Sequence, residues 1–286
     1  MTYQFIKDYK NNDAYRLSFN RLARQTFGID FEKWYQEGFW NGNYVCYSFR
    51  MGDEIVSNAS LNTMELIIEG ESKKAIQVGT VMTDPSHRRQ GLAYKLISKI
   101  LEDYDPHYNL YFLAADDEAV PLYEKCGFKY SPENKYLVDL RGYKLLDKPL
   151  EPVRLQKDKM LELKRKSQPL SEVLSARGDQ HVLMFYYTLG FEDCIYEALE
   201  DVYAIFEVKD STLHLYDILS DRKVNLMELI ECITPKSVNN IFLHFTPEKV
   251  IKGLQAELDE TSNWMIRSGG NFSFPKYARF PRISQT

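Results

Sequence analysis

The sequence has little of what would assign the chain to a fibrous, disordered or membrane-spanning class. Only 11 of its 286 residues are proline and 14 are glycine, far fewer than in collagen-like or disordered chains. Its longest uninterrupted apolar run, at 182–187, has six residues, whereas a membrane-spanning helix needs about twenty. We therefore expect a soluble globular protein that does not enter a membrane.

Cysteine is also scarce. Cys46, Cys126, Cys194 and Cys232 form no C-x-x-C pair, and no histidine lies near them in metal-ligand register. The first twelve residues carry charges where an export signal would have an unbroken apolar core. These features predict reduced thiols, no metal site and a cytoplasmic location.

The chain has fewer basic than acidic residues, 36 Lys and Arg against 41 Asp and Glu, which gives it a net charge of -5. A chain with this balance has no overall attraction for nucleic acid or for anionic lipid. The balance favours cationic small molecules as partners.

The length is sufficient for two ordinary domains. Two prolines within four residues, Pro149 and Pro152, interrupt regular structure. We place the domain boundary there, which gives domains at 1–146 and 153–286.

The first of these domains has the pattern of an α/β fold with a mostly antiparallel sheet flanked by helices. The turn at 69–71 separates two strand-like segments, and apolar residues recur at helical spacing from Leu92 until Asp105-Pro106 ends the pattern. The predicted strands are 44–49, 55–68, 75–83 and 108–114, and a further helix begins at Asp116 and ends at Gly127.

The segment where strand 75–83 stops and the next helix starts has the features of an anion site. It reads Val-Met-Thr-Asp-Pro-Ser-His-Arg-Arg-Gln-Gly-Leu-Ala over 81–93. A helix N-terminus presents free backbone N–H groups and a positive dipole end, and small residues at Gly91 and Ala93 let a phosphate approach closely. Taken alone, the segment fits equally well a solvated arginine cluster with a glycine that eases helix entry.

A second motif follows after one intervening strand. The spacings Arg88-x-x-Gly91-x-Ala93 and Ala119-x-x-x-Tyr123-x-x-x-Gly127-Phe128 together resemble the two ordered motifs of the GNAT N-acetyltransferase superfamily, over roughly 1–141. The resemblance implies that acetyl-coenzyme A (acetyl-CoA) is the co-substrate. It further implies that the acetyl group passes to a primary amine of a small molecule or peptide.

The resemblance also assigns roles to residues around these motifs. The backbone of Met82 and Thr83 would run beside the pantetheine arm, and an N–H near Met82 would stabilise the developing oxyanion. Asp116 stands at a cofactor position where the family often has asparagine. Arg88, with His87 and Lys95, is a candidate for the adenosine 3′-phosphate, and the pyrophosphate would be held by Arg89, Gln90, Gly91, Leu92 and Ala93.

In such a site the amine attacks the thioester directly, without a covalent acyl-enzyme. The departing thiolate is readily protonated by a phenol of pKa about 10, and Tyr123 fits this general-acid role. Its alternative is a tyrosine that only packs in the core. Cys126 has no matched histidine and is not expected to react. The general base stays open among Glu65, Asp84, Asp116 and an ordered water chain.

The second half predicts helices at 157–166 and 226–233 and strands at 201–208, 212–219 and 240–245. This order resembles a second, degenerate GNAT core whose turn at 220–225 has no glycine and opens with an acid, so we expect no acetyl-CoA there. This half would wall the acceptor cleft, or only stabilise the chain or form a homodimer. Two other functions compete with acetyl transfer: a non-catalytic CoA-binding regulator, which Tyr123 disfavours, and an aminoacyl-tRNA-dependent transferase with tandem GNAT halves, which the net charge disfavours.

Overall fold

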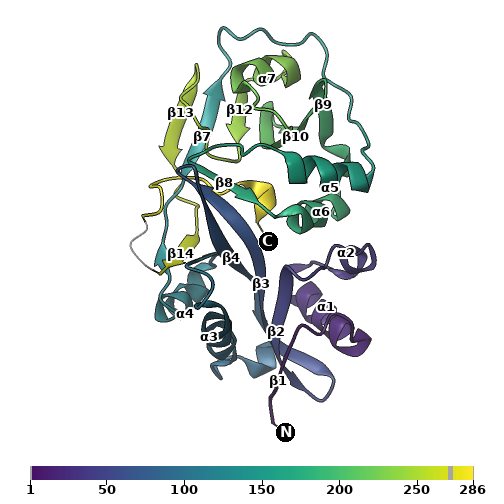
Figure 1. Ribbon diagram of the computed structural model, residues 1–286, viewed down its shortest axis with the longest axis vertical. Helices are drawn as coiled ribbons and strands as arrows, with labels where there is room; N and C mark the ends of the chain where they lie inside the picture. Colours follow the sequence, from purple (N-terminus) through teal and green to yellow (C-terminus); the bar gives the residue numbers. More distant parts are fainter. Residues whose placement is uncertain (1, 270–272, 286) are drawn as a thin grey trace.

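A computed structural model describes residues 2–269 and 273–285, and its strands form two sheets, one above the other in Figure 1. In spatial order, the lower sheet contains β1 (Gln4–Lys7), β2 (Tyr44–Met51), β3 (Glu54–Ile68), β4 (Glu71–Thr83), β5 (Leu110–Ala114), β14 (Trp264–Ser268) and β6 (Lys129–Tyr130), with β8 (Leu174–Arg177) paired to β3. The upper sheet contains β13 (Leu254–Leu258), β7 (Asn134–Asp139), β12 (Asn240–Leu243), β11 (Thr212–Leu219), β10 (Val202–Lys209) and β9 (Ile195–Leu199). Most neighbouring strands are antiparallel, which confirms the predicted fold class.

The helices pack around the two sheets, and those of the first half cover both faces of the lower sheet (Figure 1). They are α1 (Asp13–Phe27), α2 (Glu32–Gln36), α3 (Leu92–Tyr104) and α4 (Val120–Lys125), followed in the second half by α5 (Lys157–Lys166), α6 (Gln180–Thr188) and α7 (Leu226–Ile233). Short 3₁₀ turns lie at Pro85–His87, Asp117–Ala119, Phe191–Asp193 and Arg282–Ser284. Figure 1 shows α1 and α2 on one side of the sheet and α3 and α4 on the other.

The long hairpin of β3 and β4 forms the centre of the lower sheet. Glu69 and Gly70 both have positive φ, 50° and 81°, and this tight turn pairs Ile68 directly with Glu71. The ladder therefore begins at Glu71, earlier than the expected start at Ala75. Apolar side chains of α3 cover one face of this hairpin, and Leu96, Ile97 and Ile100 are fully buried there.

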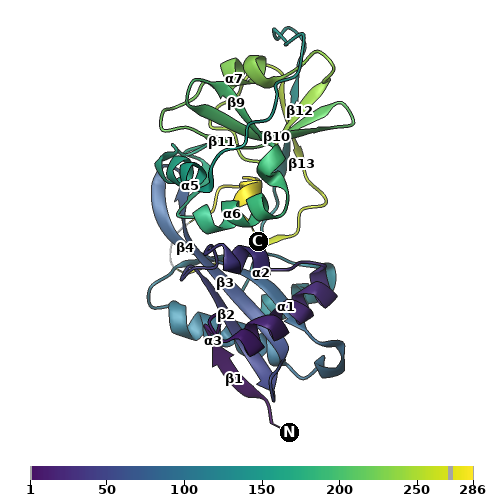
Figure 2. The same cartoon turned by 90° about the vertical axis from the view of Figure 1, so that its right-hand side faces the viewer.

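The opposite face is aromatic and joins the two halves of the chain. Phe31 of the α1–α2 connection stacks on Phe185 of α6, with ring centroids 5.0 Å apart. The indole N–H of Trp34 donates to the carbonyl oxygen of His181 at 2.9 Å. In Figure 2, α6 lies directly above α2. The second half therefore contributes side chains to the core of the first.

The two sheets also exchange strands across the expected boundary. The segment 147–152 is irregular, as its prolines predict. However, β7 precedes that segment and lies in the upper sheet, whereas β8 and β14 follow it and pair in the lower sheet. The boundary in the sequence therefore does not coincide with the division between the sheets.

No helix among the described residues is both long and apolar enough to cross a membrane.

Candidate functional site

A β-bulge opens the lower sheet next to the motif segment. Asn58 pairs with Met82 and Ser60 with Gly79, so two residues of β4 stand opposite one residue of β3. Thr80, inside the bulge, has a φ of 48°. The side-chain amide of Asn58 donates to the Thr80 carbonyl at 2.8 Å and so holds the bulge in place.

Next to this bulge, β4 and β5 pair for only three residues. Their parallel ladder joins Ala75–Gln77 to Leu110–Phe112 and then ends. The two strands separate after Gln77, six residues before β4 ends at Thr83. The separation therefore begins inside β4, just before the bulge, and not at the end of the strand.

A cavity of about 230 Å³ occupies the gap between the two strands. One wall is the bulged part of β4, and a second is the end of β5 with Asp116 and Tyr123. The third wall is apolar and comes from the α1–α2 region and α6. The lining residues are Phe27, Ile29, Phe31, Val78, Gly79, Thr80, Val81, Ala114, Asp116, Tyr123 and Phe185.

Tyr123 reaches this cavity from α4. Its side chain is 5% exposed and its ring packs edge-on against Phe128, with centroids 6.2 Å apart. Among the described residues the Tyr123 hydroxyl has no hydrogen-bond partner. Burial first, and then the negative charge of Asp116, raise the pKa of Tyr123 well above its usual range. The phenol is therefore protonated at neutral pH and able to donate.

The N-terminus of α3 is open, as the sequence predicts for an anion site. Gly91 is the N-cap with a φ of 71° and offers no side-chain acceptor to the first N–H groups of the helix. A Cβ at Gly91 would meet no atom within 4 Å, so the space in front of the helix is free. Arg88, Arg89 and Gln90 are exposed around it.

These observations fit the phosphates of acetyl-CoA, because free N–H groups, a helix dipole and exposed guanidinium groups all favour anionic oxygen. The loop is also preorganised. Asp84 accepts hydrogen bonds from the N–H and hydroxyl of Ser86, and Arg88 Nε donates to the Thr83 carbonyl at 3.2 Å. The Tyr3 hydroxyl donates to Gln90 Oε1 at 2.7 Å.

Comparison with known proteins agrees with this geometry. The family described as the acetyltransferase (GNAT) domain matches 8–131. Residues 8–131 are a GNAT acetyltransferase domain. No curated protein matches the sequence significantly.

Solved structures with the same fold extend the likeness to both halves. They include a conserved protein of unknown function from Enterococcus faecalis V583 (TM-score 0.66, 14% identity), Eis1 from Mycobacterium abscessus (0.62, 13%) and a GCN5-related N-acetyltransferase from Kribbella flavida (0.61, 16%). Each match covers 93% of this chain and 72%, 74% and 71% of the respective neighbour. At these identities the likeness is one of fold.

Within the GNAT domain, three of the predicted cofactor residues have side chains that are buried or hydrogen-bonded inside the protein. Met82 is 2% and Leu92 3% exposed, and the Thr83 hydroxyl is 2.8 Å from that of Ser57. The Met82 carbonyl accepts from the Ser57 hydroxyl at 3.2 Å and the Thr83 carbonyl accepts from Arg88 Nε, so the backbone roles expected of these residues stay predictions. The cavity itself is lined by residues that precede them in β4, Val78–Val81.

Of the three carboxylates considered as general base, the structure brings one to the cavity. Glu65 pairs with Arg177 at the β8 edge of the sheet, and Asp84 caps the turn at Ser86. Asp116 is exposed, lines the cavity beside Tyr123 and makes no capping hydrogen bond. Of the three carboxylates, Asp116 alone lines this cavity among the described residues.

Sequence reasoning missed the apolar wall and the bulge. Phe27 ends α1, Ile29 and Phe31 lie in the connection to α2, and none of them belongs to a motif. Phe185 comes from the second half of the chain. A signal for the bulge was present, since glycine inside a strand often marks one, and Gly79 lies directly before Thr80.

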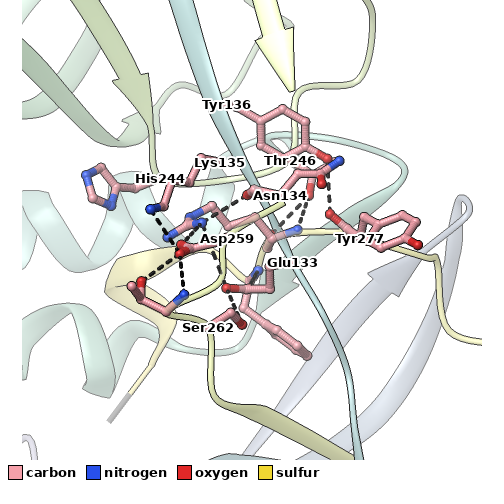
Figure 3. Close-up of polar contacts among 12 residues, drawn as sticks. Glu133, Asn134, Lys135, Tyr136, His244, Thr246, Asp259, Ser262 and Tyr277 are labelled. Atoms are coloured by element: carbon pink, nitrogen blue, oxygen red, sulfur yellow. Dashed lines mark hydrogen bonds and ion pairs between the residues drawn. The ribbon is translucent and has the colours of Figure 1, made fainter. Parts of the chain in front are cut away.

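A cluster of polar side chains lies beside the cavity at the β4 bulge, near the end of β5. Trp264 pairs with Ala114, and the Ala115 N–H donates to the Asn263 carbonyl at 2.9 Å. Beyond them a cavity of about 170 Å³ is lined by charged and polar side chains (Figure 3).

Hydrogen bonds and ion pairs of this cluster connect the C-terminal segment to the strands around it. The buried Glu133 carboxyl accepts from the Phe280 N–H at 2.7 Å. Arg279 Nη1 donates to Asp259 Oδ2 at 3.0 Å, and the Tyr136 hydroxyl donates to the Tyr277 carbonyl at 3.3 Å (Figure 3). Burial lowers the pKa of His244 to about 2, so this histidine is neutral.

Proposed function

We propose that the chain transfers the acetyl group of acetyl-CoA to the primary amine of a small molecule or peptide. The observation that carries the proposal is the combination of three features. They are the gap between β4 and β5, the uncapped N-terminus of α3, and the protonated Tyr123, whose hydroxyl has no hydrogen-bond partner among the described residues. Each is suited to one part of the reaction, and together they lie along a single stretch of the sheet.

In this proposal the phosphates bind at the start of α3. The N–H groups that follow Gly91 and the side chains of Arg88 and Arg89 hold the pyrophosphate and the 3′-phosphate. The pantetheine arm enters between β4 and β5, along the bulged residues up to Thr83. The thioester then lies near Tyr123 in the cavity.

The transfer step uses three groups of this chain. A neutral amine attacks the thioester carbon, and a backbone N–H of the bulge stabilises the oxyanion that forms. The C–S bond then breaks as Tyr123 gives its proton to the leaving thiolate. Asp116 binds the amine as the ammonium before attack and takes up one of its protons, directly or through water. The second proton, which the nitrogen loses as the amide forms, passes through water to the Tyr123 phenolate and restores the acid.

The cavity also indicates what carries the amine. Phe27, Ile29, Phe31 and Phe185 form an apolar wall opposite Asp116. An amine attached to an apolar or aromatic group fits this arrangement better than a densely hydroxylated one.

The competing functions fit the structure less well. A non-catalytic CoA-binding protein has no need of a phenol held protonated in the cavity. An aminoacyl-tRNA-dependent transferase needs a basic surface for RNA, and the chain carries a net charge of -5.

The proposal is tested first by acetyl-CoA binding. Gly91→Glu puts a carboxylate where the pyrophosphate would bind, so calorimetry should detect no binding to this variant. Gly52→Glu is the matched control, because Gly52 is exposed in a hairpin turn with a φ of 58° and equally open space. Its backbone strain is similar and its acetyl-CoA affinity should be that of the wild type. Equal affinity of both variants would contradict the phosphate site.

A further inference from the structure

A second cavity, of about 520 Å³, lies in the upper half of the molecule, next to α7. It is more than twice the size of the cavity at the β4 bulge. Its walls are the segment before β8, the turn between β11 and α7, and the segment between β12 and β13. Small-molecule sites typically have volumes of about 300–1,000 Å³.

The interior of this cavity is apolar. Phe245, 1% exposed, belongs to both the cavity lining and the core of the upper sheet. Half-buried aliphatic side chains surround it, and Val250 is 88% exposed. The aliphatic residues that both line the cavity and pack on the core are Leu170, Ile218, Val224, Leu226 and Ile251.

The lining also carries cations that protein carboxylates leave largely unneutralised. Arg222 donates to the Glu200 carbonyl at 3.0 Å, and neither Arg222 nor Lys249 forms an ion pair with another described residue. Lys223 is shared loosely by two carboxylates, 3.6 Å from Glu172 and 3.9 Å from Glu248. The cavity lining itself holds three cations, Arg222, Lys223 and Lys249, and one carboxylate, Glu248, although Asp221 directly precedes Arg222 in the chain.

The helix that begins here does not itself supply the anion site. The side chain of Asn225 accepts from the N–H groups of Met227 at 3.0 Å and Glu228 at 3.4 Å, so these donors are engaged. An anion would have to be held by the Arg222 and Lys249 side chains. A single head group suits two such mobile cations better than a nucleotide pyrophosphate does.

We propose that this cavity binds an amphipathic anion: an aliphatic chain in the apolar interior, with one carboxylate or phosphate head group at Arg222 and Lys249. The apolar lining requires the chain and the uncompensated cations require the anionic head. The proposal does not depend on acetyl transfer, because this cavity shares no lining residue with the cavity at the β4 bulge.

Calorimetric titration of the full chain with decanoate and with decyl phosphate tests the proposal and separates the two head groups. The double variant Arg222→Gln/Lys249→Gln should bind at least one of them about tenfold more weakly, the effect of losing two solvent-screened charge contacts. Lys148→Gln, which removes an exposed lysine outside the cavity, should change nothing. Hydrogen exchange should show protection by the ligand at 222–227 and 248–251.

A second variant tests the interior. Leu226→Glu introduces a carboxylate into the cavity at the first position of α7, where the helix dipole favours an acid. It should fold, as judged by its thermal transition, and bind neither probe. The proposal is overturned if neither probe binds saturably, if the double variant binds both as tightly as Lys148→Gln, or if protection appears at 27–31 and 185 instead. Unchanged acetyl-CoA affinity in all these variants separates this result from any failure of the proposed enzyme activity.

Discussion

Glu133 is a buried carboxyl whose protonation affects the fold. It is 3% exposed, and its surroundings include the Phe280 N–H, the Ser262 hydroxyl, Arg279 and Asp259 (Figure 3). Burial outweighs the attraction of Arg279 and raises the pKa of Glu133 to about 7. The folded protein therefore holds this proton more tightly than the unfolded chain, in which the pKa is near 4.5.

This difference fixes the sign of a pH dependence. Stability from the protonated Glu133 is fully present below about pH 4.5 and is lost as the pH rises toward and past 7, because folding then has to accommodate a buried charge. We expect unfolding free energy to fall by up to about 3 kcal/mol across this window. Glu133→Gln keeps an acceptor for Phe280 and should flatten the dependence in urea titrations at pH 5 and 8. Parallel profiles for wild type and variant would contradict the assignment.

At the scale of elements, a buried ion triad joins α5 to two distant parts of the chain. Lys164 Nζ lies 3.1 Å from Asp179, the N-cap of α6, and 2.8 Å from Asp217 of β11. The Ser284 hydroxyl donates to Asp179 at 2.5 Å and brings the C-terminal segment into the same network. Burial alone would lower the pKa of Lys164, but the charges of Asp179 and Asp217 together outweigh it and raise this pKa, so the ammonium is charged.

Removing Lys164 should therefore be costly. Lys164→Met leaves two buried carboxylates without their cation, and breaking such a pair typically costs about 3–5 kcal/mol of unfolding free energy. Lys166→Met on the same helix removes only an exposed pair with Glu162 and should cost no more than about 0.5 kcal/mol. Urea denaturation compares the two variants. A similar small effect for both would show that the triad does not stabilise the fold.

The elements that the sequence predicted best are those with local signals. The helices at 157–166 and 226–233 and the strand at 212–219 have the predicted bounds, because their periodicity and caps are contained within each segment. Missed elements, such as β8 and β14, are short strands whose partners lie far away in the chain. Their pairing is decided by tertiary contacts that a single sequence does not display.

The same distinction holds for the site. The loop at 81–93 and Tyr123, which we propose as the phosphate site and the acid, could be predicted because each belongs to a short motif at a fixed spacing. The bulge at Thr80 and the contribution of Phe185 could not, since one depends on the Asn58 side chain across the sheet and the other on the packing of α6 against Phe31.

At the scale of the whole molecule, the exchange of strands makes the two halves interdependent. A fragment of residues 1–146 would lack β14, which separates β5 from β6, and would leave β7 without the upper sheet. We expect this fragment to lose cooperative unfolding and to aggregate through its exposed edges. The measurement is thermal unfolding with size-exclusion chromatography, beside the full chain. A monomeric fragment with a sharp transition and full acetyl-CoA affinity would show that the first half is self-sufficient.

The most direct test of acetyl transfer is the release of free coenzyme A thiol from acetyl-CoA in the presence of a panel of primary amines. The wild type should release thiol only when an amine is present, fastest with apolar amines. Tyr123→Phe preserves the ring packing and should lower kcat by about 10²–10⁴-fold with little change in KM for acetyl-CoA. It should also lose the alkaline limb of the pH–rate profile, because that limb reports the ionisation of the acid. No amine-dependent thiol release by the wild type would contradict the proposed function, and wild-type turnover by the variant across the pH range would remove Tyr123 as its acid.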